Sequence, residues 1–141
     1  MNLTLNIEPK ALPRARHTVR ATYATSYYTK RHKETFDDYK IAVLTALKSL
    51  GHIKLPIYDK HSCIALKLTF YMKLPQSWSN KKKLAYENKY HTSKPDLDNL
   101  IKMVLDRGNT LIWEDDNIVS KIEATKLYSN NPRIEIETTL I

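Results

Sequence analysis

One segment of ten residues, 64–73, constrains the fold more than any other part of the chain. Apolar side chains occupy every second position, and lysine, threonine and tyrosine fill most of the positions between them. A period of two predicts a β-strand with one buried face, and Pro75 ends the pattern because proline cannot donate to a strand ladder. We therefore expect this strand at the centre of a sheet. Its apolar positions are Ile64, Leu66, Leu68, Phe70 and Met72.

Three further strands are predicted from the same alternation. They cover residues 2–8, 117–128 and 133–140. The last two are separated by residues 129–132, whose sequence Ser-Asn-Asn-Pro is typical of turns. We therefore expect these two strands to form a C-terminal hairpin in the sheet.

Helices are predicted between the strands. Apolar residues recur at helical spacing over residues 30–50, a short helix begins at Ser77 or Ser79, and a third begins near Asp96. The resulting order is β, α, β, short α, α, β, β. This order predicts a single compact α+β (mixed α/β) domain, residues 1–141, with helices packed against a sheet of about four strands.

Length and composition agree with one domain. The chain has 141 residues, 42% of them hydrophobic, which suffices for a sizeable core. Its one cysteine, Cys63, excludes an intramolecular disulfide and suits a reducing compartment; we expect it in the core. The N-terminus lacks the order of an export signal, and no apolar run approaches the length of a membrane span. We therefore expect a soluble, cytoplasmic protein.

Charge is distributed unevenly along the chain. The net charge is +8, yet residues 94–116 hold six of the 15 carboxylates and only three of the 23 lysines and arginines. Both segments that precede this acidic stretch are strongly basic. Such a distribution suits an enzyme that acts on a polyanion with a divalent cation, because basic side chains hold phosphates and carboxylates hold the metal.

The first half of the acidic stretch is a predicted helix. Asp96 lies at its start, and Asp98, Asn99, Lys102 and Asp106 fall in one polar strip opposite an apolar face. A purely structural explanation is open here. An aspartate at a helix start is commonly an N-cap, and Asp98 and Lys102 have the spacing of a solvated ion pair.

The second half contains Glu114, Asp115 and Asp116, which follow a helix stop at Gly108 and precede a strand. This order brings the helix and the acidic loop towards each other. If Asp116 approaches the aspartates of the helix, two charges about 4 Å apart repel by roughly 4 kcal/mol at an effective dielectric near 20. Lysine side chains or a hard cation with oxygen ligands would neutralise them, and Mg²⁺ is the natural cation beside phosphate and water.

These residues carry a family resemblance. Lys-Pro-Asp-Leu-Asp-Asn-Leu-x-Lys, then Trp-Glu-Asp-Asp-x-x-Ile after about a dozen residues, resembles the RusA family of Holliday junction resolvases, which are common in bacteria and their prophages. The resemblance extends over essentially the whole chain. It includes the N-terminal strand, a Pro/Arg-rich turn at residues 13–16, a tyrosine-rich approach to the first long helix and a C-terminal hairpin.

The resemblance implies a site and an activity. Asp96, Asp98 and Asp116 would be the catalytic, metal-binding carboxylates, Lys102 the essential basic residue, and Asp115 a further neighbour of the metal. The activity would be Mg²⁺-dependent cleavage of branched DNA, with Mn²⁺ as a substitute and four-way junctions as substrate. Because a four-way junction has two-fold symmetry and needs two paired cuts, we expect a C₂ homodimer.

Two basic patches are candidates for DNA contact. The first contains arginines followed by tyrosines that could stack on unpaired bases, and the second precedes the acidic stretch. Each could instead be a solvated basic segment, with the tyrosines packed on the core. The candidate contacts are Arg14, Arg16, Arg20, Lys81, Lys82, Lys83 and Lys94.

Two alternative functions stay open. A flap nuclease or another branch-specific nuclease would use the same metal chemistry. A non-catalytic, basic DNA-binding protein would explain the charge and the tyrosines equally well, although it has no need for the paired acidic motifs.

Overall fold

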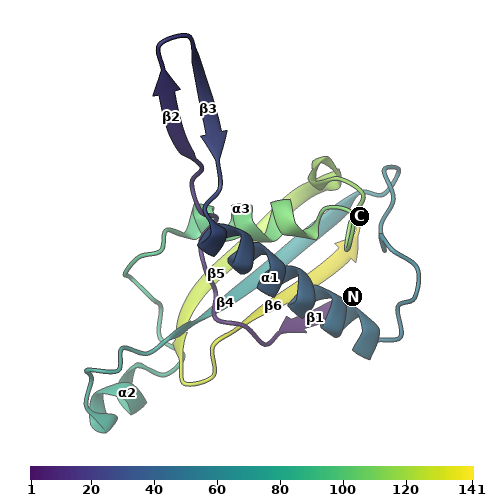
Figure 1. Cartoon of the computed structure of the whole chain (residues 1–141). Coiled ribbons are helices and arrows are strands. Elements are labelled where there is room, and N and C mark those ends of the chain that lie inside the picture. Colours follow the sequence, from purple (N-terminus) through teal and green to yellow (C-terminus); the bar gives the residue numbers. More distant parts are fainter.

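The computed structural model describes residues 1–141 and contains six strands, three α-helices and one 3₁₀ turn (Figure 1). The order confirms a single α+β domain. The elements are β1 (Asn2–Leu5), β2 (Arg16–Arg20), β3 (Tyr23–Tyr27), α1 (Lys30–Ser49), β4 (Ile64–Lys73), α2 (Asn80–Tyr86), α3 (Leu97–Gly108), η1 (Asp116–Ile118), β5 (Val119–Ser129) and β6 (Arg133–Leu140).

The main sheet has four strands in the order β1-β6-β4-β5. The strand β4 lies between β6, with which it is antiparallel, and β5, with which it is parallel. The alternation of residues 64–73 thus correctly predicted a central strand. Its even-numbered side chains are buried, and the residues between them are less buried or exposed.

The predicted C-terminal hairpin is wrong. Although β5 and β6 are consecutive, β4 lies between them in the sheet. The turn at residues 130–132 therefore crosses the end of one strand, a span of about 10 Å that three residues can bridge. The turn at residues 129–132 was predicted correctly, because it depends only on neighbouring residues. The strand order depends on α3, which forms the crossover that a parallel β4–β5 pair requires.

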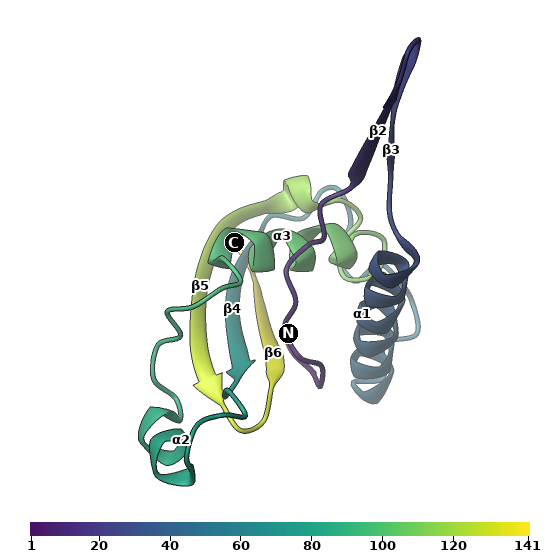
Figure 2. The ribbon, with the colours of Figure 1, turned by 60° about the vertical axis from the view of Figure 1, so that its left-hand side comes forward.

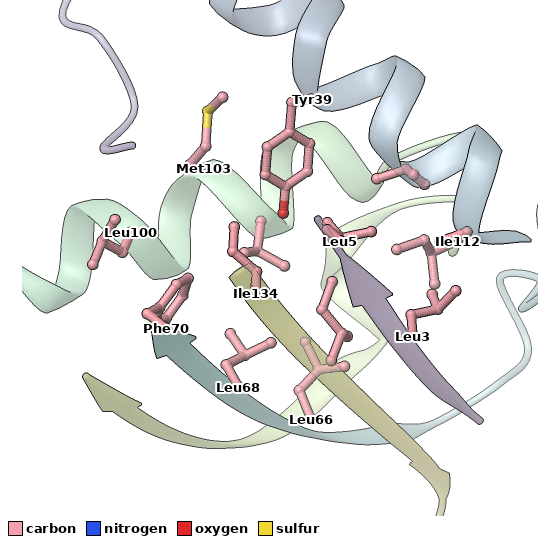
Figure 3. Close-up of a cluster of buried hydrophobic side chains, with 14 of the residues drawn as sticks. Leu3, Leu5, Tyr39, Leu66, Leu68, Phe70, Leu100, Met103, Ile112 and Ile134 are labelled. Carbon is pink, nitrogen blue, oxygen red and sulfur yellow. The ribbon is translucent and has the colours of Figure 1, made fainter. Parts of the chain in front are cut away.

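Helices α1 and α3 cover one face of this sheet, and the hydrophobic core lies between the two layers (Figures 2 and 3). Figure 3 shows Leu66, Leu68 and Phe70 of β4 facing this layer, with Leu100 and Met103 of α3 above them. The opposite face carries polar side chains. Two surface ion pairs lie there, Lys67–Glu137 and Arg133–Glu135.

Two further expectations differ from the structure. Cys63 is exposed rather than buried, because it has the same parity as the outward-facing residues of β4. The basic segment after residue 13, for which no strand was predicted, contains a hairpin of β2 and β3. The turn between them is Ala21-Thr22, which contains none of the glycine, asparagine or proline residues that usually mark a hairpin turn.

The hairpin and α2 lie at opposite ends of the molecule, with α3 between them (Figures 1 and 2). All residues of β2 and β3 are exposed, and α2 has no buried residue. No helix has the length and apolar character needed to cross a membrane.

Candidate active site

Helix α3 forms because one of its faces is apolar and fits against the sheet. Leu100, Met103 and Val104 are almost fully buried. Asp98 and Lys102 lie one turn apart on the exposed side. The packing that fixes the helix thereby presents its polar strip to solvent.

Asp96 occupies the N-cap position of α3 but does not act as a cap. Its backbone is extended, with φ −70° and ψ 144°, and its side chain accepts no capping hydrogen bond. An aspartate placed there for helix stability would accept a bond from an N–H of the first turn. A capping hydrogen bond therefore does not explain Asp96, and its exposed carboxylate is available to a ligand.

The ion pair between Asp98 and Lys102 that the purely structural explanation requires is also absent. Two ion pairs of the protein have a nitrogen–oxygen distance within 4.0 Å, Lys67–Glu137 and Arg133–Glu135. None involves a carboxylate of the acidic stretch, although the chain carries 23 lysines and arginines. The negative charge around α3 is therefore not neutralised by a paired side chain.

A lysine from the sheet holds the segment that precedes Asp96. The Nζ atom of Lys126, on β5, donates to the carbonyl oxygens of Ser93 at 2.7 Å and Pro95 at 2.8 Å. The backbone N–H of His91 donates to the carbonyl oxygen of Lys126 at 2.8 Å. These bonds fix the approach to α3 relative to the strand.

The chain returns to the helix through a tightly packed corner. Trp113 is fully buried, and its indole N–H donates to the carbonyl oxygen of Leu105 at 3.2 Å. The ring lies so close to Gly108, at the end of α3, that a Cβ there would be 2.3 Å from Cζ2 of the indole. This contact places residues 114–116 beside the helix.

The three acidic residues after Trp113 have different surroundings. Glu114 is tied to the loop before β4, since its Oε2 accepts from the N–H of Lys60 at 2.9 Å. Asp115 caps η1, because its Oδ1 accepts from the N–H of Asn117 at 3.0 Å. Glu114 and Asp115 thus accept hydrogen bonds from the backbone. This favours Asp116 as the carboxylate that is free to bind a metal ion.

Asp116 is the aspartate whose pKa is raised. Partial burial contributes most, and the negative charges of Asp115 and Asp106 raise it further. Asp106 belongs to the polar strip of α3 but was given no role from the sequence. Its spacing of eight residues from Asp98, two turns along the same face, was the available signal. A group whose ionised form is disfavoured by like charges is suited to a cation.

No three carboxylate, imidazole or thiol side chains lie close enough together to hold a metal ion. The site formed by Asp96, Asp98 and Asp116, with Asp115 as a neighbour, therefore stays a prediction. The chemistry of the donors nevertheless fits a hard divalent cation. They are carboxylate oxygens without ion-pair partners, and Asp116 is under electrostatic strain from its neighbours.

Comparison with known proteins identifies the family of the chain. The family model described as endodeoxyribonuclease RusA matches residues 6–139. The chain belongs to the RusA family. It is also 36% identical over 77 residues to the uncharacterized protein YqaN of Bacillus subtilis (strain 168), a match covering 52% of this chain and 54% of that protein. The chain thus spans about half the length of this curated relative.

In this RusA-family chain the predicted DNA contacts fall into three groups. Arg16 and Arg20 lie on the exposed hairpin, and Arg14 is exposed just before it. Lys94 is exposed beside the start of α3. The run Lys81 to Lys83 lies on α2.

The lysines of α2 are not equivalent. The Nζ atom of Lys82 lies 4.2 Å from the ring centroid of Trp78, so this side chain packs back over an aromatic cluster. Lys81 is exposed, and Lys83 is partly buried. Lys81 is therefore the member of the run most accessible to a phosphate.

Proposed function

We propose that this protein is a Mg²⁺-dependent endodeoxyribonuclease that resolves Holliday junctions in DNA recombination and repair. One observation carries the proposal beyond family membership. In a protein of net charge +8, no carboxylate of the acidic stretch around α3 forms an ion pair. Unpaired carboxylates beside exposed basic side chains suit a metal ion together with a phosphate backbone. Mn²⁺ would substitute for Mg²⁺.

Asp96, Asp98 and Asp116 would hold the metal, with Asp115 beside them. When bound, Mg²⁺ supplies orientation of the attacking water and neutralisation of charge on the phosphate and the leaving oxygen. Lys102 is exposed on the same helix, one turn after Asp98, and would stabilise negative charge on the phosphate. Asp115 holds the backbone that carries Asp116, through its bond to Asn117.

Basic side chains at both ends of α3 would hold the DNA. Lys94 would contact phosphate beside the carboxylates, while the hairpin and α2 would contact DNA on either side of the cut. We also propose a C₂ homodimer, since two symmetric sites suit two paired cuts in a two-fold symmetric junction. The place of action would be the cytoplasm of a bacterium, from a host or a phage gene.

The direct test is cleavage of labelled DNAs. The protein is expected to cut a four-way junction in Mg²⁺, to be inactive in EDTA and to recover when Mg²⁺ is restored. A linear duplex of the same sequence should be cut at least about a hundredfold more slowly, since its phosphates lack the branch geometry. Preferential cutting of a flap would favour the flap nuclease instead. Junction binding without cleavage of any DNA would favour the non-catalytic DNA-binding protein.

The contribution of α2 is testable through salt dependence. Replacing Lys81, Lys82 and Lys83 with alanine is expected to flatten the slope of log K against log salt, by about 1 for each lysine that contacts a phosphate. Because Lys82 packs over Trp78, most of the change should follow from Lys81→Ala alone. Binding is measured by fluorescence anisotropy between about 50 and 200 mM salt.

Lys48→Ala is the matched control, because Lys48 is exposed in the last turn of α1. It should leave the slope at the wild-type value. An unchanged slope in the triple variant would place α2 away from the DNA.

A further inference from the structure

The β2–β3 hairpin extends from the body of the molecule and packs chiefly on itself (Figures 1 and 2). Each strand has five residues, so the paired part is about 17 Å long. Tyr23 is 53% exposed, Tyr27 47% and Val19 79%. An isolated two-stranded hairpin is only marginally stable in water, so the exposed side chains point to an external partner.

The register gives the hairpin two chemically different faces. Directly opposite residues share a face, and the faces alternate along each strand. One face, here called the Arg–Tyr face, carries the pairs Arg16–Tyr27, Thr18–Thr25 and Arg20–Tyr23. The other face carries the pairs His17–Ser26 and Val19–Ala24.

The Arg–Tyr face combines the groups that bind nucleotides. Each tyrosine ring has a guanidinium across the strand from it, and the Nη1 atom of Arg20 lies 3.4 Å from the hydroxyl of Tyr23. A ring can stack on a base while the neighbouring cation contacts a phosphate. The opposite face has no arginine or lysine and no large ring apart from the imidazole of His17.

Both legs of the hairpin are connected to α3, one directly and the other through Phe36 of α1. In the outgoing leg, the N–H of Leu12 donates to the carbonyl oxygen of Asn99, in the first turn of α3, at 3.2 Å. In the returning leg, the ring of Tyr28 lies 5.1 Å from that of Phe36. The guanidinium of Arg107, near the end of α3, lies 4.3 Å from the same Phe36 ring. DNA held by the hairpin would therefore be DNA that also reaches α3.

The chemistry favours unpaired bases over an intact duplex. Inside a duplex each base is already stacked on its neighbours, so an aromatic ring gains little there. Tyr23 and Tyr27 lie four residues apart on one strand, about 14 Å, which is too far for both rings to stack on one base. Two separate stacking positions suit the point at which strands diverge.

We propose that the Arg–Tyr face binds unpaired nucleotides at the branch point of DNA, with Tyr23 and Tyr27 stacked on bases and Arg16 and Arg20 on the adjoining phosphates. This inference rests on the proposed function, because it assigns branch recognition to one surface of the same enzyme. The hairpin thereby selects branched DNA, while α3 carries the chemistry.

The test compares three double variants of the whole protein. Tyr23→Thr with Tyr27→Thr removes the rings and keeps residues that favour strands. Tyr23→Phe with Tyr27→Phe keeps the rings. Val19→Thr with Ala24→Thr places two threonines on the opposite face as the matched control. Affinity for a four-way junction and for a linear duplex of the same sequence is measured without metal, and the oligomeric state by analytical ultracentrifugation.

We expect the ring-deleted variant to lose at least about tenfold in junction affinity and little in duplex affinity, since each stacked base contributes roughly fivefold or more. The phenylalanine variant and the opposite-face variant should bind the junction as wild type does. All three should sediment as wild type does.

Three outcomes would overturn the inference. They are wild-type junction affinity in the ring-deleted variant, an equal loss for junction and duplex, or a changed oligomeric state, which would make the hairpin a contact between subunits. A different result would contradict the proposed function while leaving this inference intact. A wild-type protein that cuts no junction, yet binds junctions through these two rings, would retain this surface and lose the nuclease activity.

Discussion

Replacing Asp116 with asparagine is expected to abolish junction cleavage and to leave junction binding without metal unchanged or tighter. Asparagine keeps the shape of the side chain but removes the charge that binds a hard cation. The loss in rate should exceed about a hundredfold, because even residues that only support metal ligands contribute 10- to 100-fold. Binding is preserved or improved because one negative charge has left a surface that meets phosphate.

The same variant should also change stability. The raised pKa of Asp116 means that its ionised form is disfavoured in the folded protein. The resulting stabilisation by its protonated form is present below the unfolded pKa near 3.8 and is lost as pH rises through the higher folded value. At neutral pH, removing the charge should therefore raise the metal-free melting temperature slightly.

Thermal melts with and without Mg²⁺ complete the experiment. Metal should raise the melting temperature of the wild type. At a Mg²⁺ concentration 100 times the dissociation constant, it should raise the free energy of unfolding by about 2.7 kcal/mol. The variant should respond much less. Asp37→Asn is the matched control, since Asp37 is exposed on α1. If Asp116→Asn cuts junctions at a near wild-type rate, Asp116 is not a ligand, and Asp115 or Glu114 would have to take its place.

Gly108→Ala is expected to destabilise the protein by roughly 3 kcal/mol, the upper end of the range for overpacking. The added methyl group would lie 2.3 and 2.6 Å from two atoms of the Trp113 ring, which is fully buried. Relief of this clash would displace residues 114–116 from α3. Cleavage should therefore fall even at temperatures where the variant is fully folded. Urea unfolding and junction cleavage measure the two effects.

The chain offers a matched control in its one other glycine. Gly51 has a φ of +79°, and a Cβ there would meet nothing within 4 Å. Gly51→Ala should therefore cost only the strain of a left-handed backbone, about 1 kcal/mol, and leave cleavage unchanged. Equal destabilisation by the two substitutions would contradict the close packing between Gly108 and Trp113.

Local sequence patterns correctly predicted the helices and strands that bury one face and expose the other. The alternation in β4 and the helical spacing in α3 are direct consequences of burial on one face. The same parity rule, applied to Cys63, would have placed it on the outward face. What local patterns could not provide was the neighbour of each strand, because β5 pairs with β4 across a long connection.

The candidate site divides in a similar way. Apart from a family resemblance, local sequence patterns offer no basis for distinguishing Glu114, Asp115 and Asp116. The distinction depends on bonds to Lys60 and Asn117, and the bond to Lys60 comes from a segment more than 50 residues away. The β2–β3 hairpin was missed because its turn lacks the usual residues, although the strands show cross-strand pairs.

Strand β5 links the two halves of the acidic stretch. It begins immediately after η1, which carries Asp116, and through Lys126 it holds the carbonyl oxygens of Ser93 and Pro95, just before Asp96. The positions of Asp96 and Asp116 thus both depend on one strand of the four-stranded sheet. The rise of β5 between its start and Lys126 therefore sets how far apart the two carboxylates lie.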